Sequence, residues 1–207
     1  MHNMNLSKYI AKQFGNPTGI GGRIITFIMN SQNQELYMAV IQALNLNMHE
    51  TVLDIGFGNG HLIKRLAKKV QASFWGIDIS EDMLRVSCNK NRQMIKQGKM
   101  HLQVGDVSKM NYEDNFFDKV YTVNTIYFWP DINVGLAEVN RVMKTGGIFV
   151  NAFYSKEFLD RLEHTDYVYN KYTKEEWETL VAQNGFKIKD IVITKENMAY
   201  CYTLQKV

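Results

Sequence analysis

The stretch Val52-Leu53-Asp54-Ile55-Gly56-Phe57-Gly58-Asn59-Gly60 decides the fold of this 207-residue chain. An apolar run ends in three glycines at alternate positions, which let the backbone turn tightly and let a ligand approach without interference from Cβ atoms. The residues from His61 onward have a helical pattern, and the first N–H groups of such a helix point at that ligand. The stretch therefore predicts a strand over 51–55, a ligand-binding loop and a helix over 61–70.

Short apolar runs and helical stretches alternate through the rest of the chain. Such alternation implies right-handed crossovers and a mostly parallel sheet, whose ligands bind at the carboxyl ends of the strands. The capping box that starts at Thr173 opens the last helix, which Asn184-Gly185 should close. The further strands are expected over 73–77, 101–104, 119–123, 147–153, 186–193 and 198–204, and the further helices over 80–96 and 133–143. The fold class predicted is α/β: a doubly wound, mostly parallel seven-stranded sheet with helices on both faces and an antiparallel C-terminal strand pair.

The charge, the cysteines and the apolar runs of the chain indicate its partners and its compartment. The formal charge is only +3, which demands neither a nucleic-acid nor a membrane partner. Cys88 and Cys201 stand alone, a usage that suits a reducing compartment. The chain has no apolar run that could span a bilayer and no signal-peptide pattern at its start, so we expect a cytoplasmic protein. The histidines form no ligand spacing, so no metal site is predicted.

The glycine loop does not match two common nucleotide-binding patterns. A dinucleotide fingerprint that starts at Gly56 would need glycine at position 61, where His61 stands, and no Gly-Lys-Ser/Thr follows as in a P-loop. Asp54, just before the loop, would repel a pyrophosphate. It better suits a ligand with a positive charge, such as an amino or sulfonium group.

On these residues the chain resembles the class I S-adenosylmethionine-dependent methyltransferases. Residues 52–62 resemble the first motif of that family, a strand followed by D-x-G-x-G-x-G. Asp78 ends the second predicted strand 24 residues after Asp54, where an acidic residue can accept both ribose hydroxyls. Asp106 ends the third strand, and residues 141–147 resemble the R-x-L-K-P-G-G turn of the family, with Thr145 in place of proline.

The resemblance implies a site for S-adenosyl-L-methionine, which leaves as S-adenosyl-L-homocysteine. Ile79 is expected on the adenine face, and Asp106 with the Val107 N–H at the adenine edge. Backbone near Asn124 is expected to hold the amino group of the cofactor. The full predicted set is Asp54, Gly56, Phe57, Gly58, Gly60, Asp78, Ile79, Met83, Asp106, Val107 and Asn124.

The sequence indicates the methyl acceptor less clearly than the cofactor. Family members that methylate amides and bases usually carry N-P-P-Y after the fourth strand, and here both prolines are missing from residues 124–127. A small-molecule acceptor is therefore favoured over nucleic acid or protein. The candidates for the acceptor pocket are Tyr9, Phe14, Arg23, Thr125, Tyr127 and Trp129, and the candidates for a general base are Tyr127, Asp131 and His164.

Residues 1–46 are predicted to form an N-terminal helical lid over a cofactor-binding domain at 47–207. The glycine-rich loop at 15–22 suits segmental motion that excludes water. A packed helix pair with a plain turn is the alternative reading of the same residues. The chain is expected to act as a monomer or a homodimer.

The predicted reaction is an in-line displacement on the sulfonium methyl, driven mainly by positioning. A non-catalytic module that senses the cofactor or scaffolds a partner is the alternative from another class. A nicotinamide-dependent oxidoreductase is disfavoured by His61, although Tyr167 and Lys171 supply a Tyr-x-x-x-Lys match.

Overall fold

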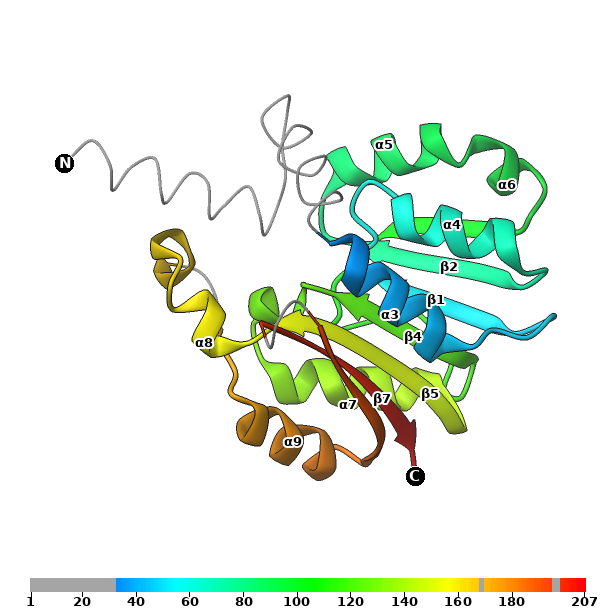
Figure 1. The fold of residues 1–207 in the computed structure, drawn as a ribbon. Helices are drawn as coiled ribbons and strands as arrows, with labels where there is room; N and C mark the ends of the chain where they lie inside the picture. The colour runs from blue at the N-terminus through cyan, green and yellow to red at the C-terminus, as the bar shows by residue number, and fades with distance from the viewer. Residues whose placement is uncertain (1–32, 168–169, 195–197) are drawn as a thin grey trace, which may run out of the picture.

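A seven-stranded sheet forms the centre of the molecule (Figure 1). The structure is a computed structural model that describes residues 33–167, 170–194 and 198–207, without the side chains of His164 and Tyr167. The strands are β1 Thr51–Ile55, β2 Ser73–Asp78, β3 Met100–Val104, β4 Phe117–Val123, β5 Met143–Tyr154, β6 Phe186–Thr194 and β7 Ala199–Lys206. The α-helices are α3 Gln34–Leu44, α4 His61–Lys69, α5 Glu81–Lys90, α6 Arg92–Lys96, α7 Ile132–Val142, α8 Lys156–Leu159 and α9 Lys174–Gln183, and the 3-10 turns are η1 Ile126–Phe128 and η2 Glu163–Tyr167.

The strands lie in the order β3-β2-β1-β4-β5-β7-β6. The first five are mutually parallel, and β7 runs antiparallel to both β5 and β6. The order reverses direction between β1 and β4, and in open α/β sheets that switch point is where ligands bind. The chain thus brings the ends of β1, β2 and β4 to one place.

Helices cover both faces of the sheet (Figure 1). On one face, α3 and α4 bury apolar side chains against the sheet, among them Leu36, Val40 and Ile63, which have no exposed surface. On the other face, α7 and α9 bury Leu136 and Trp177. These two apolar layers fix the sheet and hold its carboxyl edge in a single geometry.

The predicted elements are largely confirmed. All the predicted strands are present, the pair β6–β7 is antiparallel, and the Thr173 capping box is formed at the start of α9. The helix predicted over 80–96 is instead two helices, α5 and α6, which meet at Asn91. The Asn91 amide donates to the Ser87 carbonyl at 2.9 Å and to the Gly60 carbonyl at 3.4 Å, so the break is tied to the glycine loop.

Most of the predicted lid, residues 1–32, lies outside the described residues. Helix α3, which falls on the lid side of the predicted boundary at residue 46, packs on the sheet against β4, β5 and β7. The boundary itself stays a prediction. Within the described ranges, no helix is both long enough and apolar enough to cross a membrane.

Candidate functional site

In the loop between β1 and α4, Gly58 and Gly60 differ in what surrounds them. Both Gly58 and Gly60 have positive φ angles, of 52° and 69°, a conformation that side chains rarely adopt. A Cβ on Gly60 would lie 2.0 Å from Ser87 Oγ, so packing of α5 requires glycine there. A Cβ on Gly58 would meet no atom of the described residues within 4 Å, so this glycine faces space that they leave open. The loop therefore leaves room for a group that lies directly against its backbone.

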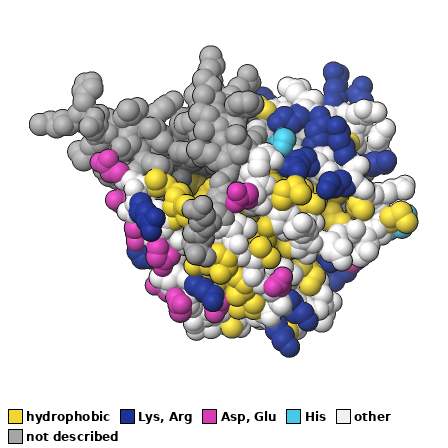
Figure 2. Space-filling model, in the orientation of Figure 1, with side chains coloured by type: hydrophobic (Ala, Val, Ile, Leu, Met, Phe, Trp, Pro, Cys, Tyr) yellow, Lys and Arg dark blue, Asp and Glu magenta, His cyan; other side chains and the backbone are white. Residues whose placement is uncertain are grey.

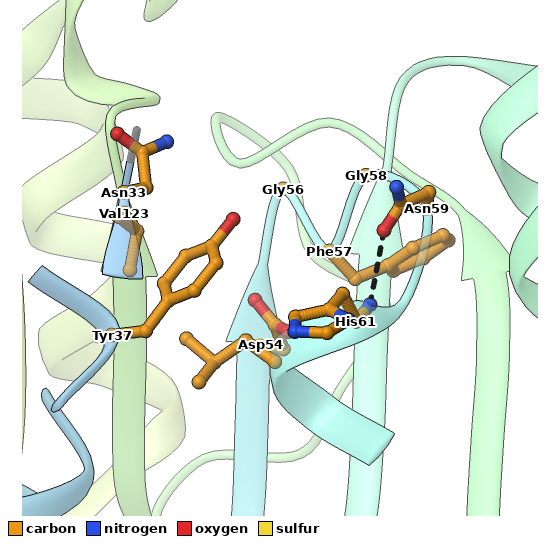
Figure 3. Close-up of a pocket in the computed structure, with 10 residues that line it drawn as sticks. Asn33, Tyr37, Asp54, Gly56, Phe57, Gly58, Asn59, His61 and Val123 are labelled. Carbon is orange, nitrogen blue, oxygen red and sulfur yellow. Dashed lines mark hydrogen bonds between the residues drawn. The ribbon is translucent and has the colours of Figure 1, made fainter. Parts of the chain in front are cut away.

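A small cavity of about 80 Å³ lies beside this loop (Figure 3). Asn33 and Tyr37, from the start of α3, lie on one side of it, and the loop and His61 lie on the other. The carboxyl end of β1 forms its floor. Its full lining is Asn33, Tyr37, Asp54, Gly56, Phe57, Gly58, Asn59, His61, Leu62 and Val123.

Asp54 is the buried acid of the cavity. Its side chain is only 4% exposed, and one of its oxygens accepts a 2.7 Å hydrogen bond from the Tyr121 hydroxyl. Tyr121 lies opposite Asp54 in the β1–β4 register, which explains the contact. Burial raises the pKa of Asp54 to about 8, and the nearby charge of Asp78 adds to that effect. A cation brought into the cavity would relieve this cost, because it would favour the carboxylate form.

Asp78 ends β2 and is held by the backbone. Gly58 N–H donates to one carboxylate oxygen at 2.8 Å, and Ser80 N–H donates to the other at 2.9 Å. Burial raises the pKa of Asp78, while these two N–H groups oppose that shift. Each oxygen has a second lone pair beyond the one that these contacts use. The carboxylate is thus fixed in orientation and can still accept further hydrogen bonds.

His61 and Tyr37 face each other across the cavity, with ring centroids 6.0 Å apart. Burial lowers the pKa of His61, and the charges of Lys90, Arg65 and Lys64 lower it further, which favours the neutral imidazole. Burial raises the pKa of Tyr37 to about 12, so its phenol is neutral as well. These residues make the walls polar but uncharged, and Asp54 is the acidic side chain that a cation entering the cavity would meet.

The ends of β2 and β3 form a more open continuation of the site. Ile79 is 50% exposed and Val104 is 45% exposed, an apolar pair at the sheet edge. The exposed Asp106 accepts hydrogen bonds from the N–H and the hydroxyl of Ser108. Val107 is 6% exposed, and Met83 is buried in α5 with 1% of its surface exposed. Of the predicted residues here, Ile79 and Asp106 have accessible side chains.

The end of β4 carries a second polar cluster. Asn124 has a φ of 57° and donates to Asn33 Oδ1 at 3.2 Å. The Tyr127 hydroxyl donates to Asn124 Oδ1 at 3.2 Å and contacts the Tyr154 carbonyl at 3.3 Å. The Tyr154 hydroxyl donates to Asn33 Oδ1 at 3.2 Å. These amide and phenol side chains therefore hydrogen-bond with one another.

Two predicted acceptor-pocket residues lie behind this cluster. Trp129 is 3% exposed, and its ring packs so closely on Gly135 of α7 that a Cβ there would lie 2.4 Å from it. Its indole N–H donates to Thr125 Oγ1 at 3.1 Å, and that hydroxyl also bonds with Thr122. In this structure both side chains are engaged in packing under the β4 loop.

Of the three candidate bases, the structure describes the side chains of Tyr127 and Asp131. Tyr127 is 2% exposed and bonded as described above. Asp131 caps α7, since its carboxylate accepts from the N–H groups of Asn133 and Val134. The side chain of His164 lies outside the described residues, as do Tyr9, Phe14 and Arg23. No group of three or more potential metal-ligating residues occurs within the described ranges.

Sequence reasoning did not find Asn33, Tyr37, Tyr121 and Tyr154 as parts of the site. Tyr121 could have been found, because it falls in the middle of a strand that neighbours the one bearing Asp54. The α3 residues had no comparable signal, since their approach to the cavity depends on how α3 crosses the sheet.

The chain matches the family described as "Methyltransferase domain" over residues 53–151. An uncharacterized methyltransferase, YdaC, of Bacillus subtilis (strain 168) is 30% identical over 125 residues, which cover 60% of this chain and 67% of that protein. A demethylmenaquinone methyltransferase of Staphylococcus haemolyticus is 32% identical over 130 residues, which cover 62% of this chain but only 53% of that protein. The chain thus spans between half and two thirds of the lengths of these relatives.

The fold has close counterparts among solved structures. A SAM-dependent methyltransferase from Aquifex aeolicus superposes with a TM-score of 0.70 at 20% identity, covering 83% of this chain and 89% of that one. At that identity the likeness concerns the fold. The Aquifex aeolicus structure and the described residues of this chain therefore share a fold.

Proposed function

This chain belongs to the S-adenosylmethionine-dependent methyltransferases of the class I fold, and we propose that it methylates a small-molecule acceptor. One observation carries the proposal. Two acidic side chains, Asp54 and Asp78, flank a glycine loop whose middle residue, Gly58, faces open space. A carboxylate pair around an open backbone suits a ligand with a cationic end and a diol, since carboxylates accept hydrogen bonds from both.

We assign the cofactor contacts by the chemistry of each side chain. Asp54 would hold the ammonium group, because it is the buried acid of the cavity and its wall residues Tyr37 and His61 are neutral. Asp78 would accept the ribose hydroxyls with the lone pairs that Gly58 and Ser80 leave free. Ile79 would lie against the adenine ring, and Asp106 would accept from its amine.

The bound cofactor supplies an electrophilic methyl group on its sulfonium. The work of the chain is then to hold two molecules in line and to exclude water, which accounts for much of such a rate enhancement. The rigid cluster of Asn33, Asn124 and Tyr127 suits this positioning role, because each group is fixed by another. A general base is not part of the proposal, since Tyr127 and Asp131 are engaged in structural hydrogen bonds.

Two features support a small-molecule acceptor. A named relative acts on demethylmenaquinone, as its name states. The turn after β4 lacks both prolines of the amide- and base-directed pattern, and partly buried aromatic side chains, Phe128, Tyr154 and Phe158, lie near it instead. Aromatic rings of this kind offer apolar surface to a compact organic acceptor.

The first test is thermal unfolding with S-adenosylhomocysteine and, separately, with NAD. A ligand at about 100 times its Kd stabilises by about 2.7 kcal/mol, which for a chain of this size raises Tm by roughly 5–11 °C. We expect that shift with S-adenosylhomocysteine alone. A shift with NAD alone would contradict the proposed cofactor site.

The second test is turnover on a panel of phenols, quinols, amines and carboxylic acids, with S-adenosylhomocysteine formation measured by mass spectrometry. Methylation of a panel member supports the proposal. Cofactor binding with methylation of a protein or RNA substrate, and of no small molecule, would refute the proposed acceptor class. Binding with no turnover on any of these would favour a cofactor sensor.

A further inference from the structure

The outer surface of helices α4, α5 and α6 is strongly basic. Residues 59–99 contain nine Lys and Arg and three Asp and Glu, a formal charge of +6 within a chain of net charge +3. Figure 2 shows Lys and Arg side chains gathered over these helices. The group consists of Lys64, Arg65, Lys68 and Lys69 on α4, Lys90 on α5, Arg92 and Lys96 on α6, and Lys99 after it. We call these eight residues the basic face.

The basic face is not neutralised by the rest of the described chain. Among the ion pairs of the described residues, none involves a member of this set. Lys64 donates to the Lys90 carbonyl at 2.6 Å, and Arg65 donates to the Gln34 amide oxygen at 2.9 Å, so both contacts leave the charge uncompensated. Burial and the charge of Lys64 lower the pKa of Lys90, as expected of crowded like charges.

An apolar hollow adjoins the basic face. It lies between the ends of α3 and α4, has a volume of about 370 Å³, and is lined by Ile41, Gln42, Asn45, Leu46, Leu66, Lys69 and Val70. Lys69 belongs to both the hollow and the basic face. Two exposed methionines lie on the same part of the chain, Met38 at 42% and Met48 at 64%. Cations and accessible apolar side chains therefore occur together.

The combination of cations and exposed apolar side chains favours an anionic lipid bilayer over a nucleic acid as the partner. A single-stranded nucleic acid is usually bound by cations together with exposed aromatic rings, on which its bases stack. The large exposed apolar side chains within the described ranges of this helical layer are Met38 and Met48, with no exposed aromatic ring among them. An anionic lipid bilayer offers phosphates for the lysines and acyl chains for the hollow, so its chemistry matches both features.

We propose that the basic face and the adjoining hollow dock this protein on bilayer surfaces that contain anionic phospholipid. Lys68 and Lys69 lie at the end of α4 farthest from the glycine loop, so docking there leaves the cofactor site accessible. The inference does not depend on which acceptor is methylated. It predicts reversible, salt-sensitive association without a membrane-spanning segment.

Sedimentation with vesicles tests the proposal on the full chain. We expect binding to phosphatidylcholine vesicles that contain about one-third phosphatidylglycerol, much weaker binding to phosphatidylcholine alone, and release as salt rises from about 0.1 M to about 0.5 M. Equal binding to both vesicle types, or to neither, would overturn it. So would tight binding to transfer RNA together with no binding to anionic vesicles.

Charge-reversal variants locate the surface. Lys68→Glu with Lys69→Glu should weaken binding to anionic vesicles by about tenfold or more, since each lysine near such a surface contributes substantially. The matched control is Lys187→Glu with Lys189→Glu on β6, two exposed lysines at the far end of the sheet, which should leave binding nearly unchanged. Both variants should keep the Tm shift with S-adenosylhomocysteine. Equal losses in the two variants would overturn the assignment of the basic face.

The hollow is tested by Leu46→Gln, which changes a partly buried lining residue but no charge. We expect severalfold weaker binding to anionic vesicles, with far-ultraviolet circular dichroism unchanged. Unaltered binding would overturn the assignment of the hollow to lipid.

Discussion

The carboxyl ends of β1 and β2 and those of β4 and β5 share one edge of the sheet, yet their polar groups are used differently. At β1 and β2, the Asp54 and Asp78 carboxylates accept from Tyr121 and from backbone N–H groups and retain free lone pairs. At β4 and β5, the amide of Asn124 and the phenol of Tyr127 are hydrogen-bonded to each other. The first half keeps acceptors available for the ligand that we propose, whereas the groups of the second half are hydrogen-bonded to one another. Substitutions should therefore change ligand affinity in one half and stability in the other.

The largest expected effect is on ligand affinity at β2. Asp78→Asn removes the charge and one acceptor, and hydrogen bonds to charged groups are worth about 1.5–3 kcal/mol, so the Kd for S-adenosylhomocysteine should rise by roughly fiftyfold. Isothermal titration calorimetry measures it. Asp190→Asn, an exposed change on β6, is the control. Equal Kd values for the two variants would show that Asp78 does not bind the ligand.

The next effect is on stability at β4. Tyr127→Phe leaves the side-chain oxygen Oδ1 of Asn124 and the backbone N–H of Tyr154 without their phenol partner, at a cost of about 2 kcal/mol or roughly 4–8 °C in Tm. The Kd for S-adenosylhomocysteine should stay within about twofold, because this group stabilises the chain more than it binds the cofactor. A large rise in Kd with unchanged Tm would reverse the comparison between the two halves.

The third effect is a pH dependence confined to β1. Burial raises the pKa of Asp54 to about 8, above its value in the unfolded chain, so the folded protein binds the extra proton between about pH 4 and 8. The contribution of Asp54 to the free energy of unfolding is therefore present at low pH and is lost as pH rises through about 8. A ligand ammonium favours the ionised form, so affinity should instead rise with pH, by up to about tenfold per unit below pH 8.

The pH effect is measured as the difference between the wild-type chain and Asp54→Asn, which keeps an acceptor for Tyr121. This difference removes the contribution of His61, which is common to the two proteins. Affinities of S-adenosylhomocysteine at pH 6.5, about 7.25 and about 8 suffice. Parallel pH profiles for the two proteins would show that Asp54 does not meet the ammonium.

The smallest effect concerns Asp131, a candidate base that caps α7. Asp131→Ala should cost about 1 kcal/mol of stability, and Asp131→Ser should restore most of it, because serine also caps helices. Methyl transfer should be nearly unchanged in both. A large loss of kcat in both variants, without rescue by serine, would instead make Asp131 catalytic.

The same contrast explains what could be predicted from the sequence. The strand ends at Asp54 and Asp78 were predictable because each follows an apolar run directly, and strand ends of a parallel sheet meet at one edge. The aromatic cluster after β4 was not, because proximity in sequence does not say which way a ring points. Trp129 turns into the layer under Gly135, a contact that depends on where α7 lies.

Long-range contacts account for the other differences. Asn33 reaches Asn124 across 91 positions of sequence, a pairing that no local pattern encodes. The break between α5 and α6 depends on the Asn91 amide reaching the Gly60 carbonyl, whereas the local periodicity is that of one continuous helix. The predicted cofactor contacts remain predictions for the experiments above, and most of the predicted lid lies outside the described residues.

The position of β7 has a consequence for the order in which the chain folds. Strand β6 is made first in sequence, but its neighbour in the sheet is β7, which in turn pairs with β5. The edge of the sheet beyond β5 therefore cannot assemble outward in the order of synthesis, and β6 with α9 must wait for β7 to insert. Because pairing of this kind is non-local, we expect it to be a slow step. A free chain truncated before residue 199 should accordingly remain protease-sensitive in residues 174–194.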